Sequence, residues 1–183
     1  MQRAGYVLVG GASSRMGCDK ALLPYRSSTL VEHIAGTVRS VAGSVTLIGP
    51  PERYGTLSLP IISDRETGYG PLGGIITALA QSAAEANLIV ACDMPNVDAE
   101  VLAELFEAAE ASPALWECVA PRSTSGLEPL CAVYHRRALP KLMQAIEAHE
   151  LKLRSILEKL TVLEVEGMAQ DQFRNLNSPE DFR

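Results

Sequence analysis

The sequence predicts a single α/β domain over residues 1–183, with a doubly wound, mostly parallel sheet and helices on both faces, in a Rossmann-like arrangement. Three observations support this fold class. Short, continuous apolar runs are typical of parallel strands that are buried on both faces. Segments with helical spacing of apolar residues alternate with these runs along the chain. The 183 residues, 47% of them hydrophobic, suffice to bury one core without a disulfide or a metal.

The predicted strands fall into a strong and a weak group. The strong ones are largely apolar and end at glycines or an aspartate: residues 6–9, 45–48 and 88–92. The weaker ones are residues 59–63, 117–120, 130–134 and 161–166. Residues 122–126 are rich in turn-forming side chains and are expected to join two of the weaker strands.

The predicted helices show apolar residues three and four positions apart. They cover residues 30–41, 75–84, 139–146 and 153–160. Asp98 is a suitable N-cap for a further helix, whose apolar face includes Leu102 and Leu105. Near the end, Ser178 and Pro179 predict the start of a last helix, with serine as the N-cap and proline in the first turn.

Three of the predicted strands end in residues that can handle a charged ligand. Gly10 and Gly11 follow the first strand, Asp64 follows the strand at residues 59–63, and Asp93 follows the strand at 88–92. In open α/β sheets, ligands bind beyond the carboxyl ends of the strands. The sequence therefore predicts a site that these residues share.

Charge and composition exclude several classes of function. The 16 basic and 22 acidic residues give a net charge of −6, which disfavours a nucleic-acid-binding surface. Residues 1–53 nevertheless carry six basic and three acidic side chains, a local balance of +3 that suggests an anion-handling end. No segment resembles a signal peptide or a membrane span, and no two of the four cysteines form a CxxC pair. We therefore expect a cytoplasmic protein with reduced cysteines.

The loop after the first strand contains both backbone and side-chain groups suited to phosphate. Its glycines allow a ligand to approach the backbone, Arg15 offers a bidentate fork, and Lys20 offers a mobile positive charge. The spacing matches neither the dinucleotide fingerprint GxGxxG nor the P-loop. This mismatch disfavours a dinucleotide-dependent redox enzyme. An ordinary strand–turn–helix connection is the alternative reading of the loop.

The loop also resembles the signature of the MobA-like nucleotidyltransferases, and its Val-Gly-Gly start and Asp-Lys end favour the guanylyl branch of that family. Further motifs continue the resemblance along nearly the whole chain. In order, they are Asp64 with Tyr69-Gly70-Pro71-Leu72-Gly73-Gly74, then Cys92-Asp93-Met94-Pro95, Glu128-Pro129-Leu130 with Ala132-Val133-Tyr134, and Asn175-Leu176-Asn177-Ser178-Pro179-Glu180-Asp181.

The resemblance implies transfer of GMP from GTP to the terminal phosphate of molybdopterin, with Mg²⁺ as cofactor and pyrophosphate as the second product. Asp93 would hold the metal; Lys20 would contact the α-phosphate and the departing pyrophosphate, and Arg15 the β- and γ-phosphates. The nucleotide would also contact Leu8, Val9, Gly10, Gly11 and Asp64, and the pterin substrate would contact Asn175 and Asn177. Transient contacts with other cofactor-biosynthesis proteins or with recipient enzymes are also expected.

Structural alternatives accompany these assignments. Asp93 could cap the turn before Pro95, Asp64 could be an ordinary loop residue, and the asparagines could form a polar turn. Gly49 departs from the family, which often has a nucleotide-holding asparagine there. The alternatives for the whole chain are a cytidylyl or sugar-phosphate nucleotidyltransferase, or a nucleotide-binding adaptor without transfer activity in cofactor delivery. Retention of both Lys20 and Asp93 disfavours the adaptor.

Overall fold

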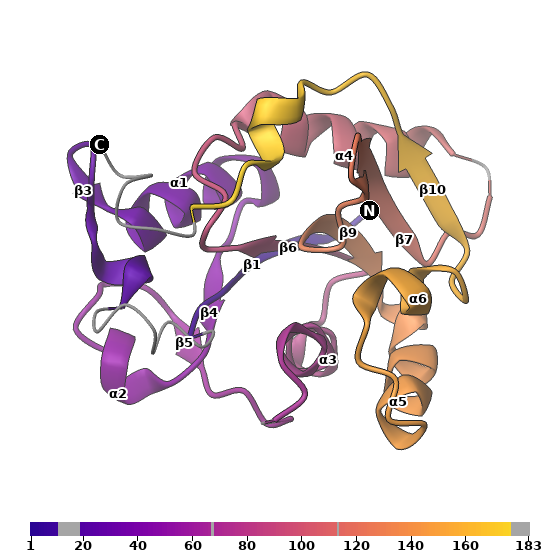
Figure 1. The fold of residues 1–183 in the computed structure, drawn as a ribbon, viewed down its shortest axis with the longest axis horizontal. Coiled ribbons are helices and arrows are strands. Elements are labelled where there is room, and N and C mark those ends of the chain that lie inside the picture. Colours follow the sequence, from indigo (N-terminus) through magenta and orange to yellow (C-terminus); the bar gives the residue numbers. More distant parts are fainter. Residues whose placement is uncertain (11–18, 67, 113, 177–183) are drawn as a thin grey trace.

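The computed structural model describes residues 1–10, 19–66, 68–112 and 114–176. One sheet runs through the middle of this part of the molecule (Figure 1). Its main strands are β1 (Arg3–Leu8), β4 (Thr46–Ile48), β5 (Ile61–Ile62), β6 (Ala86–Ala91), β7 (Cys118–Ser123), β9 (Cys131–His135) and β10 (Val162–Val165). Their order across the sheet is β10-β7-β9-β6-β1-β4-β5, and β8 (Gly126–Leu127) pairs with β7.

The sheet is mostly parallel, as the sequence predicts. β1 pairs in parallel with β4 and β6, β4 with β5, and β7 with β10. The exception is β9, which is antiparallel to both β6 and β7. Because β9 runs backwards, the turn before it lies at the same edge of the sheet as the carboxyl end of β6.

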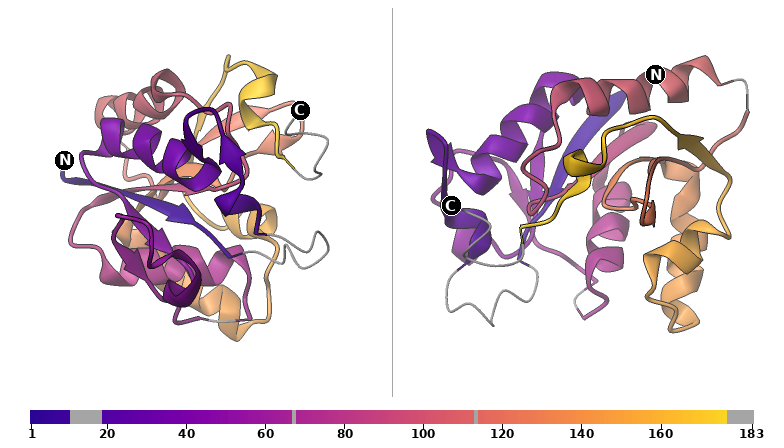
Figure 2. Two further views of the ribbon diagram at one scale, coloured as in Figure 1. Left: turned by 90° about the vertical axis from the view of Figure 1, so that its left-hand side faces the viewer. Right: turned by 45° about the horizontal axis from the view of Figure 1, so that its top comes forward.

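Helices cover both faces of the sheet, and each face has its own core (Figures 1 and 2). One core lies under α1 (Leu30–Ala42) and α4 (Ala99–Ala111), and the other under α3 (Pro71–Gln81), α5 (Leu139–Glu147) and α6 (Leu153–Leu157). Alternate residues of β1 enter different cores: Tyr6 packs on the α3 side and Val7 on the α1 side. This arrangement is why the strand is apolar throughout rather than alternating.

The ends of the helices follow local rules. Thr29 and Glu32 form a capping box at the start of α1, and Gly43 ends the helix in the left-handed region at φ 76°. Asp98 caps α4 as predicted, its carboxylate accepting the Val101 N–H. No helix in the described part of the chain is long and apolar enough to cross a membrane.

Some boundaries differ from those predicted. α3 begins at Pro71 rather than near residue 75, because Pro71 takes the first helical position, where a proline needs no N–H partner. A small hairpin, β2 (Pro24–Tyr25) with β3 (Ser28–Thr29), and the short helix α2 (Pro51–Tyr54) were not predicted, since they are too short to show periodicity. The helix predicted at residue 178 lies outside the described residues.

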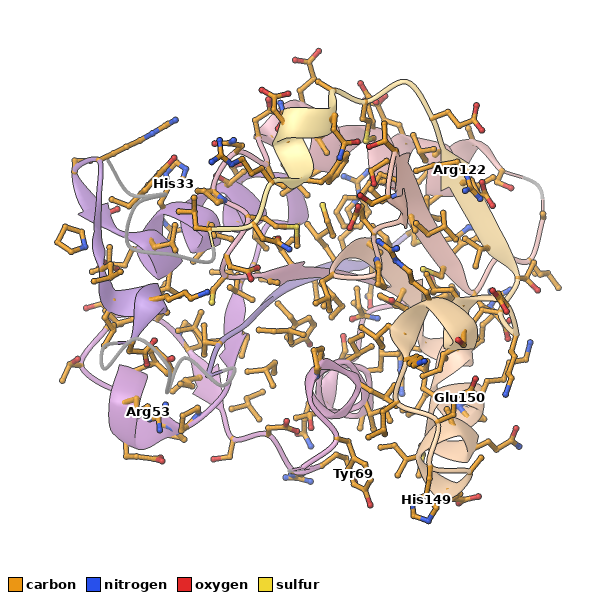
Figure 3. All side chains as sticks on the ribbon, viewed as in Figure 1. His33, Arg53, Tyr69, Arg122, His149 and Glu150 are labelled. Carbon is orange, nitrogen blue, oxygen red and sulfur yellow. The ribbon has the colours of Figure 1, made fainter. Side chains whose placement is uncertain are left out.

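Side chains also join the outer strands. Arg122 on β7 donates from Nε and Nη2 to the two carboxylate oxygens of Glu164 on β10, at 2.5 and 2.7 Å. Figure 3 shows Arg122 at this side of the sheet. The backbone ladder between residues 118–121 and 162–165 sets the register of this edge strand, and the exposed ion pair adds a side-chain contact across it.

Candidate active site

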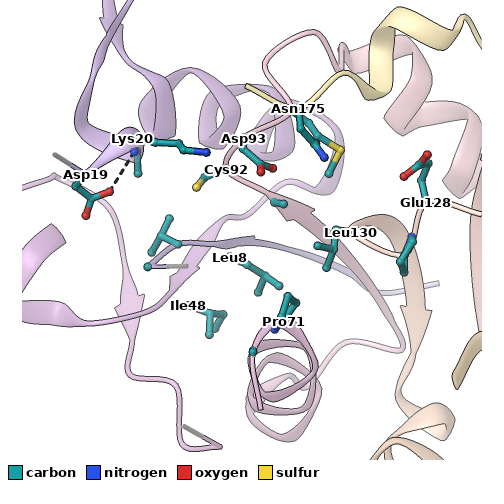
Figure 4. A pocket seen from close by; sticks show the side chains of 18 of the residues that line it. Leu8, Asp19, Lys20, Ile48, Pro71, Cys92, Asp93, Glu128, Leu130 and Asn175 are labelled. Atoms are coloured by element: carbon teal, nitrogen blue, oxygen red, sulfur yellow. Dashed lines mark hydrogen bonds between the residues drawn. The ribbon is translucent and has the colours of Figure 1, made fainter. Parts of the chain in front are cut away.

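A cavity of about 670 Å³ lies at the carboxyl edge of the sheet, where the ends of β1 and β6 meet (Figure 4). The strand order places the next two strands, β4 and β5, on one side of β1, and β6 on the other. This is the switch point at which open α/β sheets bind ligands. The cavity has the size of a small-molecule site. Its walls also include the start of α3, the turn before β9, α6 and the C-terminal segment around Asn175.

The first wall is the end of β1, where Leu8, Val9 and Gly10 line the cavity. Gly10 has φ 90°, and a Cβ there would lie 2.8 Å from Cδ of Pro50. Both the backbone conformation and this close approach therefore require glycine. Gly11 and Arg15, which were predicted to bind the nucleotide, lie outside the described residues.

Lys20 enters the cavity from a short 3₁₀ helix over Lys20–Leu22. Asp19 caps that helix, with its Oδ1 accepting the Ala21 N–H at 3.1 Å. The other oxygen, Oδ2, accepts a hydrogen bond of 2.6 Å from the hydroxyl of Tyr54, whose side chain is fully buried. The backbone that carries Lys20 is thus held from both oxygens of the preceding side chain.

The C-terminal segment joins Lys20 to Asp93. Lys20 Nζ donates to the carbonyl oxygen of Leu176 at 3.0 Å, and the Leu176 N–H donates to the carbonyl oxygen of Asp93 at 2.8 Å. The Leu176 side chain is buried in the core beneath α1 and α4. Residues 20, 93 and 176 are far apart in sequence, yet one segment links all three through hydrogen bonds.

Asp93 lies in the cavity wall just beyond the end of β6. Burial raises the pKa of its carboxyl group, and the nearby Lys20 charge acts in the opposite direction. A partly desolvated carboxylate is a suitable ligand for a hard divalent cation. Across residues 1–10, 19–66, 68–112 and 114–176, no three His, Cys, Asp or Glu side chains form a metal-binding cluster. A cation at Asp93 would therefore need further oxygens from substrate phosphates and water, which is how Mg²⁺ is commonly held.

Asp64 does not line the cavity. Its Oδ1 accepts hydrogen bonds from the Thr77 hydroxyl at 2.9 Å and from the Glu66 N–H at 3.0 Å. The same loop packs tightly on α3, since a Cβ at Gly73 would lie 2.2 Å from the Glu66 carbonyl oxygen. In this structure Asp64 thus holds its loop against α3, and the loop in turn presents Gly70 and Pro71 to the cavity.

The part of the cavity opposite Lys20, here called its far part, is lined by polar residues that we did not assign to the site from the sequence (Figure 4). Glu128 precedes β9 and Arg154 belongs to α6, and both line the cavity together with the predicted Asn175. Glu128 belonged to a recognised motif, which was a usable signal. Arg154 lies in a segment with helical spacing of apolar residues, and nothing in that pattern indicated a role in the site. Asn177, the second predicted asparagine, lies outside the described residues.

Comparisons with known proteins agree with this geometry. Residues 5–165 match the family model described as the MobA-like NTP transferase domain. The chain belongs to this family.

Relatives across the MobA-like family cover nearly the whole chain. A probable molybdenum cofactor guanylyltransferase of Flavobacterium johnsoniae is 34% identical over 97% of this chain and 93% of its own length. One from Nostoc sp. is 35% identical over 96% of this chain and 86% of its own length. The crystal structure of molybdopterin-guanine dinucleotide biosynthesis protein A from Archaeoglobus fulgidus is 27% identical, with a TM-score of 0.81, covering 98% and 94% of the two chains.

Gly49 occupies the position at which the resemblance led us to expect an asparagine. A Cβ at Gly49 would lie 2.7 Å from the carbonyl oxygen and 2.6 Å from Cγ2 of Val9. The ends of β1 and β4 therefore approach too closely for any side chain at position 49. Leu8 and Ile48, the neighbours of this close approach, line the cavity.

Proposed function

We propose that this protein transfers GMP from GTP to the terminal phosphate of molybdopterin and releases pyrophosphate. The observation that carries the proposal is the placement of Lys20 and Asp93 in one cavity at the switch point of the sheet. The curated relatives support the choice of reaction. They are named probable molybdenum cofactor guanylyltransferases, and they align with nearly the whole of this chain.

The reaction demands charge neutralisation more than acid–base chemistry. The acceptor phosphate oxygen is anionic at neutral pH, so it attacks the α-phosphorus of GTP without a general base. The new P–O bond forms as the bond to the bridging β-phosphate oxygen breaks, and pyrophosphate leaves with that electron pair. What the protein supplies is the approach of two anions and the stabilisation of charge on the α-phosphate.

We assign different residues of the cavity to different groups of the nucleotide. Lys20 is placed to contact the α-phosphate and the departing pyrophosphate, and we assign Arg15 to the β- and γ-phosphates. Leu8, Val9 and Gly10 line the wall against which the nucleotide would lie, and we assign Gly11 to the same ligand. Cys92 also lines the cavity, but burial raises its pKa to about 12, so the thiol stays neutral and is not the nucleophile.

We assign a Mg²⁺ ion to Asp93. The donor set fits, since the Asp93 carboxylate and the phosphate oxygens of the substrate would together supply the hard ligands that Mg²⁺ prefers. When bound, Mg²⁺ would neutralise phosphate charge. Asp93 would orient the ion, and the Leu176 N–H fixes the Asp93 backbone by its hydrogen bond to the carbonyl oxygen.

The pterin substrate would extend into the far part of the cavity. Asn175 lines that part, and we assign Asn177 to the same substrate. Asp64 would act on the nucleotide through the loop that it holds. Because GTP is an intracellular nucleotide, the reaction belongs in the cytoplasm, where transient contacts could hand the product to recipient enzymes.

The direct test is to incubate the purified protein with molybdopterin, Mg²⁺ and one nucleotide at a time. Formation of the guanine dinucleotide and pyrophosphate with GTP, but not with CTP or ATP, would support the proposal. A preference for CTP would move the protein to the cytidylyl branch. Nucleotide binding without pyrophosphate release would instead indicate an adaptor.

A further inference from the structure

We propose that Glu128 recognises the pterin ring of the acceptor, by accepting hydrogen bonds from the N–H groups of its 2-aminopyrimidin-4-one edge. The proposal rests on the proposed function, since it names a specificity-determining residue for that reaction. The Glu128 carboxylate lines a cavity that would receive two phosphorylated substrates.

Glu128 lies away from the predicted phosphate site. In Figure 4 its carboxylate lies on the side of the cavity that contains Asn175 and Leu130, whereas Asp19 and Lys20 lie on the opposite side. If the acceptor phosphate meets GTP between Lys20 and Asp93, the rest of the acceptor extends toward Glu128. The carboxylate therefore meets a part of the acceptor other than its phosphate.

The backbone around Glu128 is held rigidly. Its N–H donates to the Pro121 carbonyl at 3.0 Å, and its own carbonyl accepts the Cys131 N–H at 3.2 Å. The Ala91 N–H, at the end of β6, donates to the Leu130 carbonyl at 2.8 Å. These bonds tie the turn to β6, the strand that leads into Asp93, so the carboxylate has a fixed position relative to the reaction centre.

The side chain of Glu128 is held at one oxygen. Its Oε1 accepts a hydrogen bond of 2.5 Å from the Ser123 hydroxyl. Within the described residues, no donor reaches Oε2. A carboxylate is an acceptor only, with about four lone-pair sites, so most of its capacity is available to a ligand.

The ligand group that meets this carboxylate must donate hydrogen bonds. Phosphate, dithiolene and oxo groups are acceptors, so none of them can donate a hydrogen bond to this carboxylate. The pterin edge presents two adjacent donors, the 2-amino group and N3–H, which match the two oxygens of a carboxylate. Guanine carries the same pair of donors. We assign Glu128 to the pterin because it lies away from the proposed phosphate-binding end. A comparison of GTP with ITP, and of the pterin with lumazine, distinguishes guanine from pterin as the bound group.

The test uses Glu128→Gln, which keeps the size of the side chain but replaces one acceptor oxygen with an NH₂ donor. With saturating GTP, we expect the KM for molybdopterin to rise about tenfold to a hundredfold and the KM for GTP to stay unchanged. Glu107→Gln on the exposed face of α4 is the matched control and should change neither constant. Equal thermal unfolding of the variants confirms intact folds.

A binding measurement tests the same inference without turnover. 6-Hydroxymethylpterin carries the donor pair, whereas its lumazine analogue lacks the 2-amino group. The wild-type protein should bind the pterin more tightly, as followed by pterin fluorescence, and Glu128→Gln should lose this discrimination. Unchanged discrimination and an unchanged KM for molybdopterin would overturn the proposal.

Two further outcomes distinguish failure of the Glu128 assignment from failure of the proposed function. If Glu128→Gln instead loses discrimination between GTP and ITP, the residue reads guanine, and the pterin assignment is wrong. If the wild-type protein forms no dinucleotide product, the proposed function fails, while the fluorescence titration still decides whether Glu128 binds the pterin edge.

Discussion

The hydroxyl of Tyr54 donates a hydrogen bond of 2.6 Å to Oδ2 of Asp19, the residue immediately before Lys20. Tyr54 is fully buried, and burial together with the Asp19 carboxylate raises the pKa of its phenol well above the ordinary value. The hydroxyl therefore remains a donor throughout the physiological pH range. Through it, α2 helps to position the predicted phosphate-binding lysine.

Tyr54→Phe removes this donor with little change in volume. A hydrogen bond to a charged group contributes about 1.5–3 kcal/mol, so we expect a loss of stability in that range and a fall in kcat. Urea unfolding and steady-state kinetics measure the two effects. Asp19→Asn leaves one carbonyl oxygen in place of two, so it can keep either the Ala21 cap or the acceptor for Tyr54 but not both, and it should also lower stability and kcat. A Tyr54→Phe protein with wild-type stability and kcat would show that the contact positions nothing.

Lys20→Ala and Asp93→Ala should each fold and lose transfer activity. Removal of a preorganised charge at a phosphoryl centre costs on the order of 10²–10³ in rate. Pyrophosphate release from GTP and molybdopterin measures the loss, and circular dichroism verifies folding. Lys152→Ala is the control, because Lys152 is exposed and does not line the cavity. Turnover near the wild-type level in either site variant would exclude that residue from catalysis.

Gly49→Ala should destabilise the protein, because the new Cβ would meet the Val9 backbone at 2.7 Å. Strain of this kind typically costs about 1–3 kcal/mol. Gly36→Ala is a matched control within α1, where a Cβ meets no atom of the described residues within 4 Å. That change should instead stabilise by about 0.5–1 kcal/mol. Chemical unfolding gives the free energy of unfolding of both variants. Equal changes of the same sign in this free energy would refute the close approach of the ends of β1 and β4.

Glu117 should stabilise the fold in a pH-dependent way. Burial raises the pKa of its carboxyl group, but hydrogen bonds from Lys141 Nζ and the Thr161 N–H, each at 2.7 Å, outweigh burial and lower the pKa overall. A carboxyl with a lowered folded-state pKa contributes stability above its unfolded pKa, and this stability is lost as the pH falls through the folded pKa. Glu117→Gln should therefore be less stable than wild type at neutral pH, with a difference that shrinks in acid.

Fluorescence of Trp116 provides the readout for Glu117. It is the single tryptophan of the chain, it is buried, and it precedes Glu117 directly. Urea unfolding at pH 7 and at pH 3 should give a difference of about 1.5–3 kcal/mol at the higher pH and a smaller one at the lower. The exposed Glu107→Gln variant should show no such pH dependence. A constant difference at both values would mean that ionisation of Glu117 does not stabilise the fold.

Local patterns were enough to predict most of the sheet and its helices. Apolar runs such as residues 88–92 predicted buried strands, and β6 spans Ala86–Ala91. Gly10 and Asp93 could be placed in one site because carboxyl ends of parallel strands share an edge, and the structure brings both to the cavity. Asp64 also follows a parallel strand and was placed in the site for the same reason. Its carboxylate instead accepts a hydrogen bond from the Thr77 hydroxyl and does not line the cavity.

The sequence by itself determined the fold class and the grouping of Gly10, Lys20 and Asp93 in one site, because periodicity and strand-end chemistry are local properties. Only the tertiary structure showed that β9 runs antiparallel, which brings Glu128 to the cavity, and that Leu176 bonds to both Lys20 and Asp93. Strand direction and contacts between distant segments depend on how the whole chain packs. No window of neighbouring residues encodes them, so the sequence predicted Asn175 in the site but not Arg154 or the hydrogen bonds of Leu176.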